Sequence, residues 1–157
     1  MSNIHGDFIW YELLTSDADA AGQFYADVVG WISRPADQPG MDYRFFHSDP
    51  ALGKDSGVGG YMTITPDMAA GGARPGWIGY VAVDDVDAAC ATAKANGGAV
   101  SMGPMDLEGV GRMAMIADPE GVPIYVMRGA SDEPSQSFVK HAPRVGHGAW
   151  NELASAD

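Results

Sequence analysis

The sequence predicts an α+β fold built from two βαβββ units in tandem, at about residues 8–65 and 77–128. Each unit opens with an apolar, strand-forming stretch and continues with a capping residue before an apolar stripe of helical spacing. Each then returns to short strand-like segments separated by turn residues. The same order of elements occurs twice, and this repetition is the main evidence for the fold class.

The first unit begins with a predicted strand over residues 8–14. Ser16 or Asp17 can cap the helix that follows, because a side-chain oxygen there satisfies free backbone N–H groups. We expect the helix to end at Gly30, since glycine suits a helix end. The expected buried face of this helix comprises Ala20, Ala21, Phe24, Tyr25 and Val28. Three strands are then expected: a short one from Trp31, one at 41–48 and one at 57–65.

The second unit follows a connector at residues 66–76 that is rich in glycine and proline. A strand is predicted at 77–83, with Asp84 capping the next helix and Asn96-Gly97-Gly98 ending it. The expected buried face of this helix comprises Val86, Ala89, Cys90 and Ala93. The remaining predicted strands are 99–102, 110–117 and 122–128, with a tight turn at 118–121.

The last residues repeat the beginning of the chain. Trp, Glu, Leu and Asp of the segment 10–17 recur at identical spacing in the segment 150–157. We interpret residues 1–130 as one domain, 131–146 as a linker or tail, and 147–157 as the first strand of a possible truncated second copy. Truncation, an ancestral duplication and chance remain open. An unpaired strand is an aggregation liability, so it must dock on its own domain, pair with another chain or be disordered.

Composition excludes several classes of function. The formal net charge of −12 is unsuited to binding a phosphate backbone, which needs clustered lysine and arginine. No apolar run approaches the roughly 18 residues that span a bilayer. The first residues lack the pattern of a signal peptide, and the single cysteine, Cys90, is typical of a reducing compartment. We therefore expect a cytoplasmic protein without nucleic-acid or membrane partners.

Several motifs together resemble those of the vicinal oxygen chelate superfamily, which includes glyoxalase I, bleomycin resistance proteins and extradiol dioxygenases. They are Asp17 followed seven residues later by Phe24-Tyr25, then Gly30-Trp31, and Asp118-Pro119-Glu120-Gly121 before the last strand. The resemblance covers about residues 8–128. It implies that the two units curl into an open barrel-like cup that binds a small molecule. It also implies pairing of modules, as a homodimer or with an intramolecular second domain.

The resemblance further implies where a metal would bind. In metal-dependent members, His, Gln or Glu from the first and last strands of the units hold a divalent ion, and the matching positions here are Trp10, Ile78 and Tyr125. The fourth position falls near Gly60 to Met62, where there is no His or Glu. Indole and isoleucine offer no usable donor. We therefore expect no metal cofactor. The alternative is a metal-dependent lyase, isomerase or dioxygenase with displaced ligands for Zn, Ni or Fe, since an offset of two residues moves Glu12 into a ligand position.

Alternation along the strands then selects the residues that line the cup. Trp10 and Glu12 share one face, as do Ile78 and Tyr80, and Tyr125 and Met127. The expected cavity residues are Trp10, Glu12, Tyr61, Ile78, Tyr80, Tyr125 and Met127. The catalytic residue, if one exists, is unassigned. Glu12 is the candidate, as a group that binds a cation or as a general base if burial raises its pKa. In the alternative, Glu12 pairs with Arg44 or Arg112 or lies at the rim.

Other chemistry-bearing residues point to structural roles. His5, His47, His141 and His147 show no paired spacing, and His47 is expected at the surface or at a subunit contact. Cys90 lies on an apolar helix face, where we expect a small core residue. Three hypotheses follow: a metal-free domain that binds an aromatic or cationic molecule, a glyoxalase-type enzyme drawing on Glu12, Tyr125 and His47, or an assembly module whose cup is filled by its own side chains.

Overall fold

The computed structural model describes residues 3–37, 40–49, 51, 53, 56–139 and 141–155. Its described part contains eight strands and three helices. In chain order they are β1 (Phe8–Thr15), α1 (Ala18–Val29), β2 (Ile32–Pro35), β3 (Tyr43–His47), β4 (Gly57–Thr63), α2 (Pro66–Ala70), β5 (Gly76–Ala82), α3 (Val86–Ala95), β6 (Ala99–Leu107), β7 (Gly111–Ala117) and β8 (Pro123–Gly129). The predicted α+β fold is confirmed.

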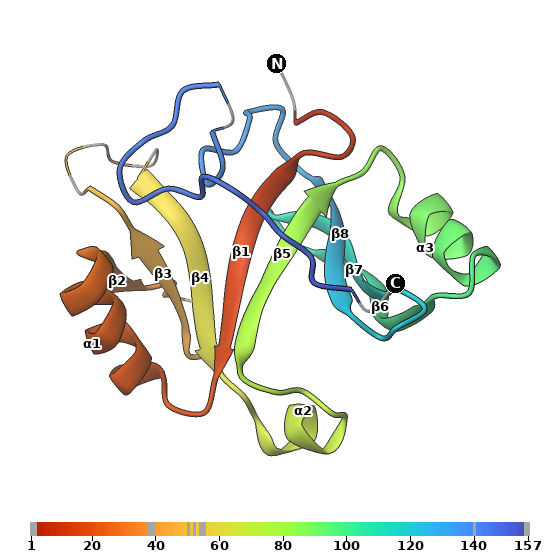
Figure 1. Cartoon of the computed structure of the whole chain (residues 1–157), viewed down its shortest axis with the longest axis horizontal. Coiled ribbons are helices and arrows are strands. Elements are labelled where there is room, and N and C mark those ends of the chain that lie inside the picture. The colour runs from red at the N-terminus through yellow and green to blue at the C-terminus, as the bar shows by residue number, and fades with distance from the viewer. Residues whose placement is uncertain are drawn as a thin grey trace.

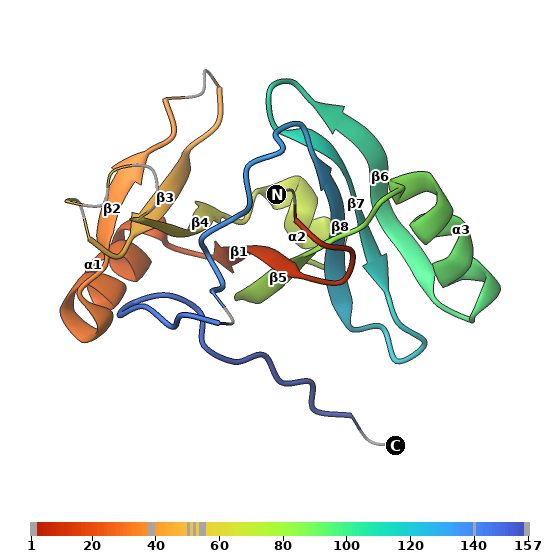
Figure 2. The ribbon, with the colours of Figure 1, turned by 90° about the horizontal axis from the view of Figure 1, so that it is seen from above.

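All eight strands form one sheet in the order β2-β3-β4-β1-β5-β8-β7-β6 (Figure 1). The first strands of the two units, β1 and β5, lie antiparallel at its centre. Each of them pairs in parallel with the last strand of its own unit, β4 or β8. The sheet is open and bends between its two wings, as the view from above shows (Figure 2). It therefore has a convex face and a concave face.

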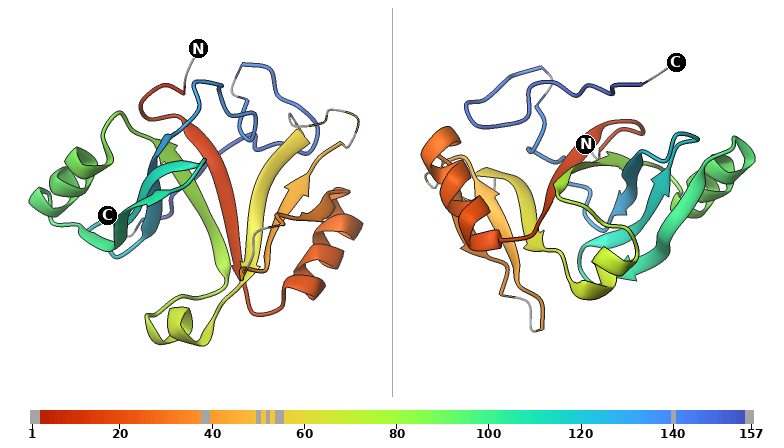
Figure 3. Two further views of the ribbon diagram at one scale, coloured as in Figure 1. Left: turned by 180° about the vertical axis from the view of Figure 1, so that it is seen from behind. Right: turned by 60° about the horizontal axis from the view of Figure 1, so that its bottom comes forward.

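The helices α1 and α3 cover the convex face at opposite flanks of the sheet (Figure 3). Under α1, Leu13, Phe46 and Tyr61 form one buried cluster. Under α3, the corresponding cluster contains Val83, Val86, Cys90, Ala114 and Val126, so the expected core role of Cys90 is confirmed. A third cluster belongs to the concave side of the central strands, and it carries the candidate site.

Helix α1 begins and ends where the sequence predicts. The Asp17 carboxylate accepts a hydrogen bond of 2.9 Å from the backbone N–H of Ala20, and Gly30 ends the helix in the left-handed conformation. Its predicted buried face is wrong in part, since Phe24 and Val28 are 56% and 65% exposed. The helix instead turns Gly22 toward the sheet. A Cβ there would lie 2.7 Å from the Tyr61 hydroxyl, so glycine allows this close approach.

The second unit differs from prediction in three local features. Asp85, rather than Asp84, caps α3 by accepting a hydrogen bond of 2.9 Å from the Ala88 N–H. The connector contains the short helix α2, for which Thr65 is the cap and Pro66 the first residue. Strand β6 extends to Leu107, because it pairs with β7 as far as Gly111 despite two register shifts.

The described residues from 130 to 139 and from 141 to 155 cross the sheet near β1 and β5 without joining it (Figure 1). Trp31 Nε1 donates to the Gly146 carbonyl at 2.7 Å, and the Tyr11 hydroxyl donates to Asn151 Oδ1 at 2.9 Å. Residues 149–155 form no strand, and Trp150 is 80% exposed. The expected strand is thus not formed as far as residue 155, and residues 156 and 157 lie outside the described part. The proposed domain boundaries stay a prediction.

No helix in the described part of the chain is long and apolar enough to cross a membrane.

Candidate functional site on the concave face

The Glu12 carboxylate lies at the centre of the concave side and is 5% exposed. The Tyr80 hydroxyl donates a hydrogen bond to Glu12 Oε2 at 3.0 Å, and the Tyr125 hydroxyl donates to Oε1 at 3.1 Å. Both carboxylate oxygens are therefore held by phenols that come from the second unit. This arrangement is the most distinctive polar feature of the sheet.

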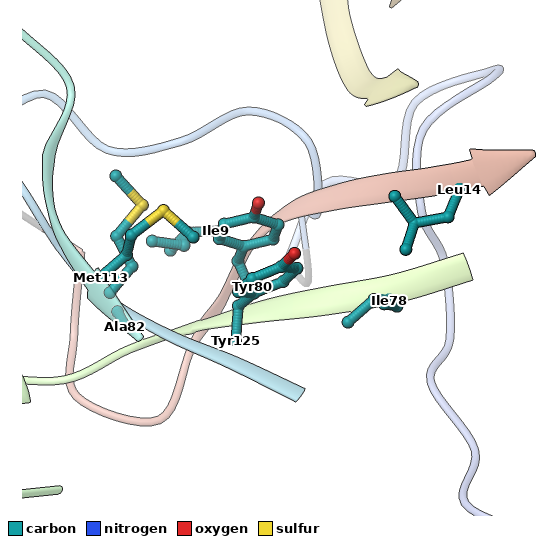
Figure 4. Close-up of a cluster of buried hydrophobic side chains, with 8 residues drawn as sticks. Ile9, Leu14, Ile78, Tyr80, Ala82, Met113 and Tyr125 are labelled. Carbon is teal, nitrogen blue, oxygen red and sulfur yellow. The ribbon is translucent and has the colours of Figure 1, made fainter. Parts of the chain in front are cut away.

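Strand register explains why these groups meet. Glu12 is opposite Ile78 across β1 and β5, Trp10 is opposite Tyr80, and Tyr80 is opposite Tyr125 across β5 and β8. The rings of Tyr80 and Tyr125 stack with centroids 4.2 Å apart and planes at 21°. In the close-up their hydroxyls lie on the same side of the stack (Figure 4). One row of neighbouring strand positions thus directs two phenols toward one carboxylate.

The first unit contributes a third phenol, that of Tyr43 on β3. Trp10 Nε1 donates a hydrogen bond of 3.2 Å to the Tyr43 hydroxyl, and this hydroxyl is close enough to Glu12 to lower the pKa of the carboxyl. The Tyr43 ring lies over Gly60, where any Cβ would overlap it. Gly60 is therefore required for the position of Tyr43 and, through it, for the position of the Trp10 indole.

Burial dominates the electrostatics of this cluster. It raises the pKa of Glu12 above its ordinary value, and the hydrogen bonds from Tyr80, Tyr125 and Tyr43 lower that pKa in part. Burial and the Glu12 charge raise the pKa of all three tyrosines. The phenols are consequently protonated near neutral pH and act as donors to the carboxylate.

No arginine neutralises Glu12 among the described residues. Arg44 pairs with Asp19 at 2.6 Å and with Asp42 at 2.9 Å. Arg112 pairs with Asp87 at 2.7 Å and with Asp106 at 2.9 Å. The alternative expectation, in which Glu12 pairs with either arginine or lies at the rim, is therefore wrong.

Six of the seven expected cavity residues share one packed cluster: Trp10, Glu12, Ile78, Tyr80, Tyr125 and Met127. Tyr61 is the exception. It is completely buried on the convex side, stacked on Phe46 and hydrogen-bonded to Ser33. Alternation along β4 places Gly60 and Met62 on the concave side and Tyr61 on the convex side. The cavity position assigned to Tyr61 was therefore wrong by one residue.

The sequence interpretation missed the contribution of β3. Tyr43, Phe45 and His47 alternate along this strand, and Phe45 makes an edge contact with Trp10 at 5.9 Å between centroids. The alternation of these aromatic residues along the strand was the sequence signal that could have placed them on one face. Half-buried methionines complete the concave surface: Met62, Met68, Met102 and Met115. Their unbranched side chains give an adaptable apolar wall.

Comparison with known proteins identifies the fold family. The family model for the glyoxalase/bleomycin resistance protein/dioxygenase superfamily matches residues 8–126. The chain belongs to this superfamily. Methylmalonyl-CoA epimerase from Mycobacterium tuberculosis has a similar structure, with a TM-score of 0.55 and 19% identity over 83% of this chain and 93% of that chain. At this identity the likeness concerns the fold.

Two curated relatives are closer in sequence. The Mycobacterium bovis protein named "Putative glyoxylase CFP32" is 39% identical over 132 residues, which cover 83% of this chain and 47% of that protein. Anthracycline biosynthesis protein DnrV of Streptomyces peucetius is 35% identical over 127 residues, or 76% of this chain and 46% of that protein. The chain spans about half the length of the curated relatives it matches.

The site does not fit the divalent metal that some members of the superfamily hold. The positions that the resemblance matches to metal ligands are Trp10, Ile78 and Tyr125, and the Tyr125 hydroxyl donates a hydrogen bond to Glu12. Glu12 is the single carboxylate of the cluster, and no group of three His, Cys, Asp or Glu residues in the described part of the chain is arranged to bind a metal. His47 does not join Glu12, because its Nδ1 contacts Ser56 Oγ at 2.8 Å.

Proposed function

We propose that this superfamily member is a metal-free domain that binds a small planar, largely apolar molecule on its concave face. The observation that carries the proposal is the Glu12 carboxylate, fixed without a cation by Tyr80 and Tyr125 beneath half-buried aromatic and methionine side chains. A buried carboxylate with a raised pKa on a concave surface is a candidate functional group. Both oxygens of this carboxylate are hydrogen-bonded to tyrosine hydroxyls, and neither faces a group of described residues that could bind a metal with it.

In this proposal Glu12 belongs to the floor of the site. Its two oxygens already accept hydrogen bonds and it is 5% exposed, so a cationic ligand would have to displace the phenols to reach it. The expected binding of a cation by Glu12 is therefore not part of the proposal. Glu12 instead orients Tyr80 and Tyr125, whose stacked rings form an ordered surface.

The ligand would contact the side chains above this floor. Trp10, Tyr43 and Phe45 are half-buried and meet edge to face, while Met102 and Met115 form the opposite wall. Aromatic edges and flexible thioethers favour flat conjugated molecules. The relative named for anthracycline biosynthesis supports this class of ligand, because anthracyclines contain fused planar rings.

Two other features of the protein stay predictions. They are a cytoplasmic location and completion of the cup by a second module, either in a homodimer or within a longer chain. The recurrence of Trp10 and Glu12 as Trp150 and Glu152 supports a second module. The activity of the longer relatives is not transferred to this chain.

A neutral fluorescent probe tests the proposal. N-phenyl-1-naphthylamine should bind the wild-type protein with increased emission, and Phe45→Ala should weaken binding about tenfold through loss of ring contacts. Phe24→Ala is the matched control, because Phe24 is exposed on α1 at the convex face. Met115→Ala on the opposite wall gives a second measurement. Equal affinities of the Phe45 and Phe24 variants, or no binding by the wild type, would contradict the proposal.

A further inference from the structure

We infer that the ligand of the concave face carries an anionic group, which Arg34 binds at the β2 side of the site. This inference rests on the proposed function and adds the charge of the ligand to it. The charge of the proposed ligand is thus opposite to that of the cationic molecule that the sequence suggested. Three observations support it: the face to which Arg34 belongs, the absence of an ion-pair partner among the described residues, and the chemistry of the neighbouring strand positions.

Cross-strand pairing places Arg34 on the concave face. Arg34 is opposite Phe45 in the β2–β3 ladder, and Phe45 contacts the Trp10 ring. The preceding pair, Ser33 and Phe46, belongs to the convex side, where both contact Tyr61. Because side chains alternate along a strand, Arg34 lies beside Phe45 on the face that carries Trp10 and Glu12.

Arg34 is a free cation in the part of the chain that the structure describes. It is exposed and has no carboxylate of a described residue within ion-pair distance, whereas Arg44 and Arg112 each bind two aspartates. A chain with a net charge of −12 offers many acidic groups. An arginine without one, next to an aromatic wall, is therefore available for an anion from solution.

The described strand positions of the concave face bring no accessible carboxylate to Arg34. Among the strand residues that alternation places on the concave face, the acidic and basic side chains are Glu12 and Arg34, and Glu12 is enclosed by phenols. His47, the next concave residue on β3 after Phe45, has its pKa lowered by burial and by the charge of Arg34. It is therefore neutral near pH 7, and the accessible charge of this face is positive.

The chemistry of the guanidinium defines the ligand class. Its planar fork forms paired hydrogen bonds with carboxylate, sulfonate or phosphate oxygens. Arg34, Phe45, Gly60 and Glu12 are successive neighbours in the strand pairing, so a flat ligand can contact Phe45 and Trp10 while its acidic group meets Arg34. The ligand is thus a planar aromatic acid.

Two probes that differ by one sulfonate test the inference. They are 8-anilinonaphthalene-1-sulfonate and N-phenyl-1-naphthylamine, titrated by fluorescence into the wild type and into Arg34→Met, Arg34→Lys and Arg128→Met variants. Arg128 is an exposed arginine on β8 that alternation places on the convex face, so its variant has the same charge change away from the site. We expect the Arg34→Met variant to lose about fivefold in affinity for the sulfonate and none for the neutral probe.

The accompanying results are equally specific. The preference for the sulfonate over the neutral probe should be retained in part by the Arg34→Lys variant and in full by the Arg128→Met variant. Salt at about 0.5 M should reduce this preference in the wild type. If both probes bind but the Arg34 and Arg128 variants behave alike, the inference is overturned and the proposed function stands. If neither probe binds the wild type, the proposed function fails and the inference with it.

Discussion

Glu12 and Tyr80 are joined by a buried hydrogen bond of 3.0 Å across 68 positions of sequence. The bond connects the first strand of one unit with the first strand of the other, because β1 and β5 are neighbours at the centre of the sheet. Tyr125 adds a second bond from the last strand of the second unit. A single carboxylate of the first unit thereby organises two rings of the second, and the floor of the concave face depends on both units.

Removing one phenol should destabilise the fold. In the Tyr80→Phe variant, a buried carboxylate oxygen loses its donor, and we expect the free energy of unfolding to fall by about 1–3 kcal/mol. Tyr25→Phe is the control, since the Tyr25 hydroxyl contacts Trp77 at an exposed site and its loss should matter less. Urea denaturation of both variants measures the difference. Equal losses would show that the hydrogen bond to Glu12 contributes no more to the free energy of unfolding than the exposed bond of Tyr25.

The raised pKa of Glu12 has a defined consequence for stability against pH. The folded state holds the Glu12 proton more tightly than the unfolded state, so this group favours folding most below its ordinary pKa of 4.5. Its contribution declines as pH rises from there toward the folded-state pKa. The free energy of unfolding of the Glu12→Gln variant should therefore increase relative to that of the wild type as pH rises from about 4.5.

Denaturation at several pH values between about 4 and 8 measures this trend. Glu108→Gln is the matched control for the same chemical change, because Glu108 is exposed in the turn between β6 and β7. A constant difference between wild type and Glu12→Gln across the range would show that the pKa of Glu12 is not raised.

Much of the fold followed from local signals in the sequence. Asp17 and Gly30 delimit α1 because capping chemistry is local, and alternation correctly grouped Trp10 with Glu12 and Tyr80 with Ile78. Tyr61 was misplaced because a shift of one residue transfers a strand side chain to the opposite face. Tyr43 was missed because its contact with Trp10 depends on the absence of a side chain at Gly60, a long-range packing relation. Local patterns therefore located the floor of the site but not its β3 wall.

Gly60 should be intolerant of any side chain. In the Gly60→Ala variant the new Cβ overlaps the Tyr43 ring, and we expect a loss of about 1–3 kcal/mol in the free energy of unfolding. Gly76→Ala is the matched control, because a Cβ at this strand position has no atom within 4 Å. A Tyr43→Ala, Gly60→Ala double variant should lose less than the sum of the single changes. Strict additivity would indicate that the two residues do not interact.

Metal titration decides between the proposed function and the metal-dependent alternative. The donors near Glu12 are three protonated phenols and an indole N–H, so Ni²⁺ or Zn²⁺ added to the apo protein should show no stoichiometric tight binding by calorimetry. Weak binding at exposed histidines such as His5 would persist in the Glu12→Gln variant, since His5 is adjacent to Asp84 and remote from β1's centre. Tight binding that Glu12→Gln abolishes would require the phenols to turn away from the carboxylate. That result would restore an enzyme with displaced ligands as the better interpretation of the concave face.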